Sequence, residues 1–349
     1  MAKGGFVMEA LLKQLCRIDA VAGYEEELRL FLAEQARPFA DEMYTDPLGN
    51  LLLFKKGSLR RKRPCLVSAH MDEVGLLVND YEKTGEMVFS PVGPVDPKAL
   101  IAKKLSVGAE KRFGVVALKA IHMTTPAERK IVPGYDKLRL DVGALNEDDA
   151  KQLVKVGTPA AFRSPLTAFG QGLVYGKALD SRVPCAVMLS LLQNDLAYDT
   201  WFAFTACSKI GHRGAGILSR RLDPGLSITL TGTSAADLPE VEDYLAGTHV
   251  GKGAAIVMMD KGTIYEQDLY RPLAEQATER KIPWQYKKVY SETTDASAIH
   301  HGASGAKCLA LAVPVRNIDT AVATVALSDV ESLYQLAQLS LERSGVGNV

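Results

Sequence analysis

The sequence predicts an α/β domain that is interrupted by a small β-rich domain. Three observations support this fold class. Short apolar runs, typical of buried strands, alternate with helical segments near both ends of the chain. From about residue 76 to 163 the pattern changes to short alternating strands that are separated by Gly and Pro. The length of 349 residues is enough for two domains of ordinary size.

The first part of the chain predicts two amphipathic helices and two strands. The helices are expected over residues 6–18 and 25–40, with Leu28, Phe31, Leu32 and Phe39 on one face of the second. Residues 46–50 read Asp-Pro-Leu-Gly-Asn, which favours a turn before a strand at 51–54. Residues 64–70 form a short apolar run that ends in His70, as expected for a strand in a sheet covered on both faces.

The β-rich insert and the last part of the chain supply the remaining elements. The insert includes expected strands at 87–91, 104–107 and 113–120. After it, strands are expected at 173–176, 201–207, 226–230, 256–259 and 309–314, and helices at 180–192, 212–221 and 329–342. Strands and helices therefore alternate on both sides of the insert, which is the pattern of an interrupted α/β domain.

Composition and charge exclude several classes of protein. The chain is 47% hydrophobic and 23% charged, as in globular proteins. Lys and Arg total 41, as do Asp and Glu, so the basic surplus of a dedicated nucleic-acid binder or a polybasic membrane anchor is missing in bulk. Residues 60–63 form one basic cluster, which we assign to a solvated loop. No nucleic-acid or membrane partner is expected.

The cysteines and the first residues predict a cytoplasmic protein. The five cysteines are scattered and contain no Cys-x-x-Cys pair, so we expect reduced, small core residues. Glu9 and Lys13 interrupt the apolar pattern of residues 6–18, which therefore resembles neither an export signal nor a membrane span. No later run approaches about 18 uninterrupted apolar residues.

Two segments carry chemical signals. His70, at the carboxyl end of a predicted buried strand, is followed two residues later by Asp72, which could orient the imidazole. Asp180 follows a strand and begins a predicted helix. Each has a structural alternative, because His70 could be a satisfied core histidine and Asp180 a helix N-cap rather than a bridge between metal ions.

Taken together, four segments resemble a known family. They match, in order, motifs of the dinuclear-metal aminopeptidases, which include glutamyl and tetrahedral (TET) aminopeptidases and members labelled endoglucanases. The segments are His70-Met-Asp72-Glu-Val-Gly, Gly176-Lys-Ala-Leu-Asp180-x-Arg182, Gly211-x-Arg213-Gly-Ala215 and Thr294-Asp295-Ala-x-Ala-Ile299. The resemblance extends from about Val21 to Glu331. A glycosidase is not expected, because nothing singles out an opposed carboxylate pair.

The resemblance implies a fold and an assembly. A phosphopeptidase-like catalytic domain, with a mixed central sheet flanked by helices, would comprise residues 1–75 and 164–349. Residues 76–163 would be a PDZ-like β-barrel that serves in dimerisation. Since the family assembles into dimers and then dodecamers, we expect a homo-oligomer.

The resemblance also implies a site with two divalent metals that activate a shared water. His70 would ligate one metal, Asp180 would bridge both, and Asp72 would stand behind His70. The other positions differ from the family. Ser208 stands where the family has its general base, and Lys209 and Thr231 stand where it has carboxylate ligands. Asp319 replaces a histidine ligand and remains a weak candidate.

Lys209 is the substitution that bears most directly on whether the site can hold two metals. An ammonium has no lone pair for a metal, so we expect Lys209 to replace the second metal and to pair with Asp180 and Asp319. The expected cofactor is none, or a single zinc, cobalt or manganese ion. Asp295 matches a residue that shapes the family's site, and Arg316 is placed near its substrate pocket. If the register differs, substitute ligands are His212, Asp237, His300 and His301.

Three functions follow. The first is an impaired pseudo-peptidase that binds small peptides or acts as an oligomer subunit. The second is a working aminopeptidase with an atypical, single-metal site. The third uses Lys209 as a base or nucleophile, which the flanking carboxylates disfavour because they raise its pKa.

Overall fold

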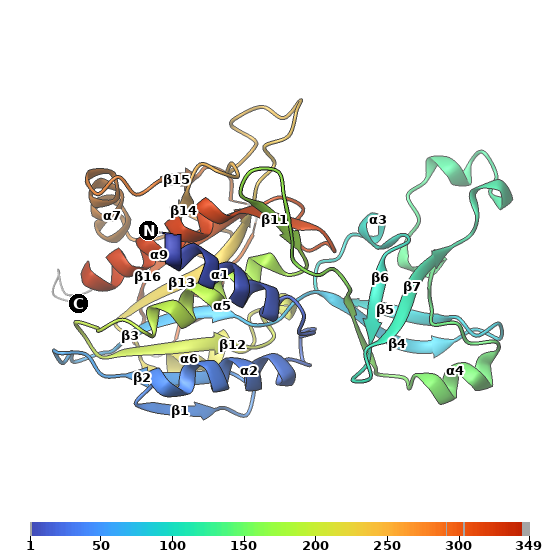
Figure 1. Ribbon diagram of the computed structural model, residues 1–349, viewed down its shortest axis with the longest axis horizontal. Helices are drawn as coiled ribbons and strands as arrows, with labels where there is room; N and C mark the ends of the chain where they lie inside the picture. Colours follow the sequence, from blue (N-terminus) through green and yellow to red (C-terminus); the bar gives the residue numbers. More distant parts are fainter. Residues whose placement is uncertain (1, 291, 303, 344–349) are drawn as a thin grey trace.

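The computed structural model describes residues 2–290, 292–302 and 304–343. Figure 1 shows an elongated molecule with a large α/β lobe and a smaller β-barrel lobe. The chain enters the barrel after β3 (Cys65–His70) and returns to the larger lobe before β10 (Thr167–Phe169). An interrupted α/β fold with a small barrel, as the sequence predicts, is therefore confirmed.

An eight-stranded mixed sheet forms the centre of the larger lobe. In spatial order it contains β1 (Glu42–Thr45), β2 (Leu51–Lys55), β12 (Thr200–Thr205), β3, β13 (Leu226–Ser234), β16 (Lys307–Val315), β14 (Ala254–Val257) and β15 (Trp284–Lys287). The neighbours β12, β3, β13 and β16 are parallel. Their carboxyl ends meet at one edge of the sheet, which is where ligands bind in open α/β sheets.

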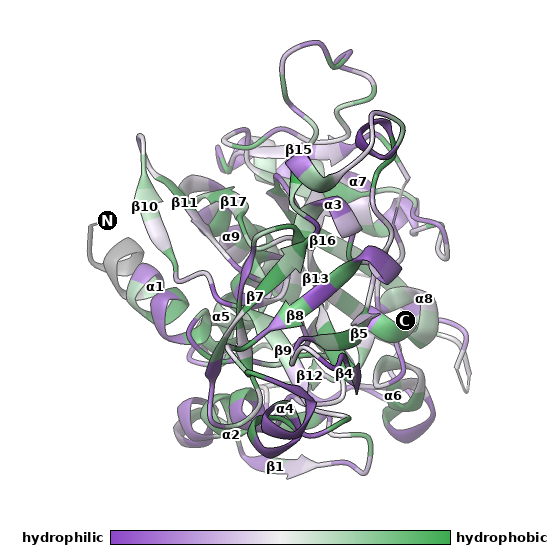
Figure 2. Ribbon diagram, turned by 90° about the vertical axis from the view of Figure 1, so that its right-hand side faces the viewer, coloured by the Kyte–Doolittle hydropathy of each residue, from purple (hydrophilic) through white to green (hydrophobic). Residues whose placement is uncertain are grey.

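Helices cover both faces of this sheet. They are α1 (Ala2–Leu15), α2 (Glu26–Ala36), α5 (Leu179–Leu191), α6 (Ala215–Leu222), α7 (Gln267–Glu279), α8 (Ala296–Ile299) and α9 (Leu327–Arg343). One face packs against α1, α5 and α9 in the main hydrophobic core. The short helices α6 and α8 pack on the other face, where Leu66 and Ile299 belong to a smaller core. Figure 2 shows β16 as one of the largely hydrophobic central strands.

The smaller lobe is a closed antiparallel barrel with its own core. Around the barrel the strands are β4 (Gly75–Tyr81), β5 (Met87–Val92), β8 (Leu138–Asp141), β7 (Arg112–Leu118), β6 (Lys104–Val107) and β9 (Pro159–Phe162). The helices α3 (Pro97–Leu100) and α4 (Glu147–Leu153) lie between barrel strands. Separately, β10, β11 (Leu173–Gly176) and β17 (Ala323–Ala326) form a three-stranded antiparallel sheet in the larger lobe.

An arm projects from the barrel between β7 and β8 (Figure 1). It holds three short 3-10 turns, η2 (Ile121–Met123), η3 (Glu128–Lys130) and η4 (Tyr135–Lys137). Its apolar side chains are open to solvent, since Ile121, Met123 and Ile131 are each 65–72% exposed. The arm therefore offers apolar surface that the chain itself does not cover.

Three predicted boundaries are wrong for local backbone reasons. The second helix ends at Ala36 in a 3-10 turn (η1, Arg37–Phe39) that contains Pro38, and Phe39 is exposed rather than on the buried face. Strand β12 ends at Thr205, since Cys207 has a left-handed φ of 56°. Helix α6 begins at Ala215 instead of residue 212, since His212 has a φ of 52°.

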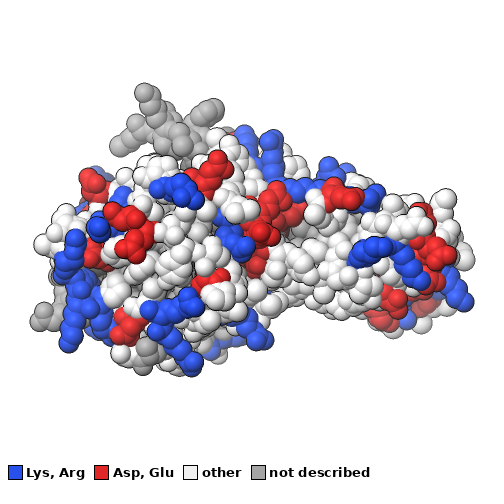
Figure 3. Space-filling view, turned by 90° about the horizontal axis from the view of Figure 1, so that it is seen from below, with Lys and Arg blue, Asp and Glu red and all other residues white. Residues whose placement is uncertain are grey.

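Surface charge and thiols agree with the composition. Figure 3 shows Lys and Arg interspersed with Asp and Glu on the face drawn. All five cysteines are free, and all except Cys207 are buried. In the part of the chain that the structure describes, no helix combines the length and apolarity that spanning a membrane requires.

Candidate active site

The predicted site residues meet at a cavity of about 510 Å³ at the carboxyl ends of the parallel strands. Its wall includes His70, Asp180, Ser208, Lys209, Thr231, Asp295 and Asp319. Strand β13 passes very close to the start of α5, since a Cβ atom at Gly232 would lie 2.5 Å from the Cβ of Asp180. Only glycine therefore allows β13 and Asp180 to share this wall.

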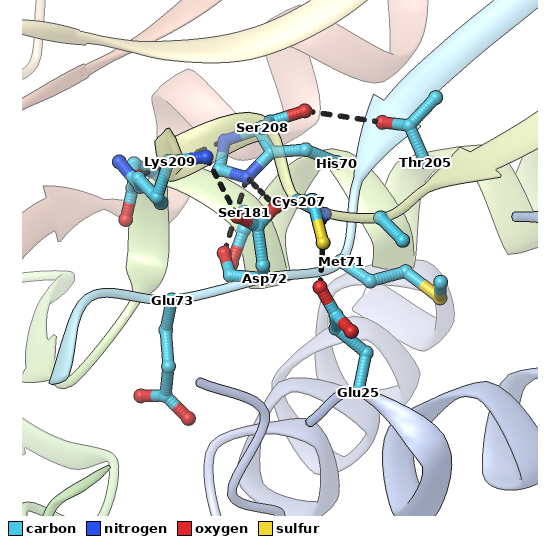
Figure 4. Close-up of polar contacts among 12 residues, drawn as sticks. Glu25, His70, Met71, Asp72, Glu73, Ser181, Thr205, Cys207, Ser208 and Lys209 are labelled. Carbon is cyan, nitrogen blue, oxygen red and sulfur yellow. Dashed lines mark hydrogen bonds and ion pairs between the residues drawn. The ribbon is translucent and has the colours of Figure 1, made fainter. Parts of the chain in front are cut away.

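His70 is the last residue of β3, and its ring lies between two aspartates. Its Nδ1 is 3.1 Å from the Asp72 carbonyl oxygen and 3.4 Å from Asp72 Oδ1, while its Nε2 is 3.7 Å from Asp180 Oδ2. Figure 4 shows His70 and Asp72 beside Ser208 and Lys209. Burial by itself would lower the pKa of His70, but Asp72 and Asp180 outweigh burial and raise it.

Lys209 lies in the 3-10 turn η5 (Ser208–Ile210), which follows β12. Its Nζ donates to Asp180 Oδ2 and to Asp319 Oδ1, each at 2.6 Å. Its backbone N–H donates to Asp72 Oδ2, also at 2.6 Å. The two predicted ion pairs of Lys209 are therefore confirmed, and Asp72 fixes the turn that presents the ammonium.

The charges of this cluster favour the ionised forms of Lys209 and Asp180. Burial of Lys209 disfavours its ammonium, yet Asp180 and Asp319 outweigh that effect and raise its pKa above the usual range. Burial likewise opposes ionisation of Asp180, while Lys209 and His70 outweigh it and lower the pKa of that carboxyl. Lys209 is therefore a fixed cation at neutral pH, which removes the basis for a role as a free base or nucleophile.

A second polar cluster centres on Asp295, immediately before α8. Its Oδ1 accepts hydrogen bonds from Ser208 Oγ at 2.6 Å and from His212 Nδ1 at 2.8 Å, and its Oδ2 accepts one from Thr205 Oγ1. Burial would raise the pKa of Asp295, but His212 and Ser208 outweigh it and lower the pKa to about 2. Asp295 thus holds three side chains together at this wall, and its role in shaping the site stays a prediction.

Comparisons with known proteins identify the family. Residues 49–336 match the M42 glutamyl aminopeptidase family. The chain belongs to this family. The family resemblance predicted from the motifs is thereby confirmed.

Relatives of this chain are similar over nearly their whole length. The lysyl aminopeptidase of Pyrococcus furiosus is 29% identical over 342 residues, which cover 95% of this chain and 96% of that protein. The crystal structure of a TET aminopeptidase from a marine sediment Thaumarchaeota archaeon has a TM-score of 0.92 at 28% identity and covers 97% of both chains. The TET1 peptidase of Pyrococcus horikoshii, described as assembling into a tetrahedron or a large octahedral shell, has a TM-score of 0.85 at 28% identity, covering 96% of this chain and 99% of that one.

Two further positions that the M42 resemblance singles out, Thr231 and Arg316, make their side-chain hydrogen bonds outside the lysine cluster. Thr231 lines the cavity, and its hydroxyl donates to the Gly232 carbonyl oxygen at 3.2 Å. Arg316 does not line this cavity. Its Nε and Nη2 donate to the two carboxylate oxygens of Asp237 at 2.6 and 2.7 Å, so Arg316 and Asp237 neutralise one another.

The substitute ligands named from the sequence do not gather around the lysine cluster. His300 and His301 stack on each other with ring centroids 3.8 Å apart, and His300 Nδ1 bonds the Ala296 carbonyl oxygen. His212, another of these candidates, bonds Asp295 and Thr293. Within residues 2–290, 292–302 and 304–343, no group of three or more His, Cys, Asp or Glu side chains is arranged to hold a metal ion.

Sequence reasoning missed the network that supports the site from behind. Lys177 and Arg182, from the motif that also supplies Asp180, both bond the buried Glu73 at 2.9 Å. Arg182 also donates to the carbonyl oxygens of Leu15, Ile18 and Met71. These two cations inside an otherwise apolar stretch were the available signal, because buried charges need partners.

Proposed function

We propose that this chain is an M42-family protein whose metallo-aminopeptidase chemistry is impaired, and that it holds small peptides or serves as a subunit of an oligomer. One observation supports this function best. The Lys209 ammonium lies 2.6 Å from both Asp180 and Asp319, the carboxylates that the family resemblance assigns to metal binding.

The donor set does not fit a pair of metal ions. The Lys209 ammonium has no lone pair to donate. At about 4 Å and an effective dielectric constant near 20, its repulsion of a dication would be about 8 kcal/mol. Asp180 and Asp319 already bind a cation that belongs to the chain. Lys209 therefore satisfies electrostatically the two carboxylates that would otherwise recruit a metal.

The proton acceptor of the family's reaction is also replaced. Ser208 stands at the position of the general base, and its hydroxyl donates to Asp295 Oδ1 at 2.6 Å. A serine hydroxyl has no pKa near 7 and does not accept a proton as a carboxylate does. Loss of the base and loss of the second metal would both impair the family's peptide hydrolysis.

Metal content tests this proposal. We expect no bound metal after the protein is loaded with excess zinc, cobalt or manganese and desalted, as read by elemental analysis. Two metals per chain would contradict the proposal. The double variant K209E/T231D restores carboxylates at two ligand positions and serves as the matched control, which we expect to retain more metal than the wild type.

A single-metal aminopeptidase is the alternative function. It is favoured by His70 Nε2 and Asp180 Oδ2, which lie 3.7 Å apart on one wall of the cavity. One metal per chain, together with release of N-terminal residues from peptides that stops after chelation and returns on reloading, would establish this alternative. We expect no such turnover.

A homo-oligomer, from a dimer up to a dodecamer, is the proposed assembly. The exposed apolar side chains Ile121, Met123 and Ile131, which share one short arm of the barrel, support it, because apolar surface gathered in one region favours association. Relatives of known structure that assemble into closed shells add to this support. Light scattering coupled to size exclusion should show a mass that is a multiple of 37.7 kDa, whereas a monomer would contradict the assembly.

A further inference from the structure

Three side chains form a hydrogen-bonded row on the wall of the cavity, separate from the lysine cluster. Thr293 Oγ1 lies 2.8 Å from His212 Nε2, and His212 Nδ1 lies 2.8 Å from Asp295 Oδ1. All three residues line the cavity. A hydroxyl, an imidazole and a carboxylate joined in this order have the spacing by which proteins activate a nucleophile.

The proton positions in this row follow from Asp295. An ionised carboxylate only accepts hydrogen bonds, so His212 must carry its proton on Nδ1 to bond Asp295. In the neutral imidazole, His212 Nε2 then has a free lone pair and accepts the hydroxyl proton of Thr293. Asp295 thus fixes the imidazole tautomer that a general base requires.

The backbone turns His212 toward this row. Gly211 and His212 have φ angles of 106° and 52°, and these left-handed residues precede α6. A non-glycine residue in this conformation costs roughly 1 kcal/mol, and such strain gathers at functional sites. The strained backbone of this loop therefore places the His212 ring between Asp295 and Thr293.

Exposure increases along the row in the order that catalysis needs. The Asp295 side chain is 3% exposed and the His212 side chain 18%, while Thr293 is an exposed residue. The orienting carboxylate is thus buried and the hydroxyl is open to a ligand. A purely structural role for this row would not require the Thr293 hydroxyl to face the cavity.

We propose that Thr293, His212 and Asp295 form a metal-independent acyl-transfer centre that takes small carboxylic esters. Thr293 is the nucleophile, His212 the base, and Asp295 a positioning residue. Neither the family match nor the lysine cluster implies this activity, and it does not depend on whether the chain binds a metal. The cavity volume of about 510 Å³ suits a small ester.

The proposed step balances as follows. Thr293 Oγ1 forms a bond to the acyl carbon, and its proton moves to His212 Nε2. The bond between the acyl carbon and the alcohol oxygen breaks, and the alcohol leaves with that proton. Water then gives a proton to His212 Nε2 and attacks the acyl carbon. The bond between the acyl carbon and Thr293 Oγ1 breaks, the carboxylic acid leaves, and the proton on His212 returns to Oγ1. Lys261 lines the same cavity, and its backbone N–H donates to the carbonyl oxygen of Glu292, the residue before Thr293, at 3.0 Å.

The test uses 4-nitrophenyl acetate with excess chelator, so that metal chemistry does not contribute. We expect a burst of nitrophenolate approaching one equivalent per chain and one acetyl group on the peptide that contains Thr293. T293V should lose the label and at least tenfold of the burst rate, whereas T293S should keep both. H212Q should lower the acylation rate by about 100-fold or more.

The control is a second His–Asp pair. His249 Nε2 lies 3.1 Å from Asp243 Oδ1 at the surface, and H249Q should acylate at the wild-type rate. D295N should lower the acylation rate at saturating ester without raising the half-saturating concentration, because Asp295 does not touch the ester. Labelling of Cys207 or a lysine instead of Thr293, absence of any label, or a wild-type rate in T293V would each overturn the proposal. A positive metal analysis would overturn only the proposed function.

Discussion

Two lysines each place an ammonium between two carboxylates, yet they differ in what surrounds them. Lys177 has a side chain that is 2% exposed and binds Asp19 and Glu73. Lys209 has a side chain that is 12% exposed and binds Asp180 and Asp319. The first is sealed inside the fold, and the second faces the cavity.

This difference separates a lysine that stabilises the fold by joining segments of the interior, which we call a brace, from a lysine that forms part of the cavity wall. Glu73, beside Lys177, also binds Arg182, whose guanidinium bonds carbonyl oxygens at the end of α1 and after it, so the network ties separate segments together. The partners of Lys209 lie at the carboxyl ends of the sheet, Asp180 in the first turn of α5 and Asp319 in the loop after β16. The same chemical motif therefore joins segments of the interior in one place and lines the cavity in the other.

The variant K177M should show the largest effect. Removing one partner from a buried charge network costs about 3 to 5 kcal/mol, because Glu73 would lose a cation in a dry environment. Urea denaturation measures this loss as a lower free energy of unfolding. K307M, which breaks an exposed pair with Asp268 at 2.8 Å, is the control and should cost less than about 1 kcal/mol. Equal losses in both variants would refute the idea of a brace.

The variant K209M should destabilise the protein by a smaller amount, about 2 to 3 kcal/mol at neutral pH, since water in the cavity screens the two remaining carboxylates. Their mutual repulsion raises the folded-state pKa of at least one of them. The loss should therefore shrink as the pH is lowered and the carboxylate takes up a proton. Denaturation at pH 7 and pH 5 measures this. A loss larger than that of K177M would mean that Lys209 is itself a brace.

Much of the fold could be predicted because periodicity and burial agree along the chain. Strand β3 ends at His70 as expected, and β6 and β11 have their predicted bounds. Boundaries failed where one residue adopts a left-handed φ, as at Cys207 and His212, since single-residue backbone strain leaves no periodic pattern. The edge strand β1 was not predicted because none of its four residues is buried, and helix α7 was not predicted because Pro272 interrupts its helical pattern.

The site was partly predictable for a different reason. The pairs of Lys209 could be predicted because the family resemblance places Asp180, Lys209 and Asp319 at one site, where their opposite charges favour pairing. The row from Thr293 through His212 to Asp295 joins residues more than 80 positions apart, and its direction depends on a strained turn. No spacing rule relates such residues, so only the three-dimensional structure brings them together.

The Asp295 cluster has the opposite arrangement to the two lysine clusters. Here one carboxylate lies at the centre, and hydroxyls and an imidazole surround it. Its folded pKa of about 2 lies below the ordinary aspartate value of about 3.9. A depressed carboxyl pKa stabilises the fold above the unfolded-state pKa, and this stabilisation disappears as the pH falls through the folded one. The contribution should thus be about 2 kcal/mol above pH 4 and vanish toward pH 2.

The variant D295N isolates this contribution. The difference in the free energy of unfolding between wild type and D295N should be constant from pH 7 to about pH 5 and then shrink steadily as acid protonates Asp295. S208A removes one donor to the same carboxylate, so it should keep the shape of the wild-type curve with a smaller acid-sensitive part. A difference that stays flat down to pH 2 would show that Asp295 gains no stabilisation from its charge. The hydrogen bonds of Asp295 to His212 and Ser208 would then position these side chains without stabilising the fold by charge, unlike the ion pairs of both lysines.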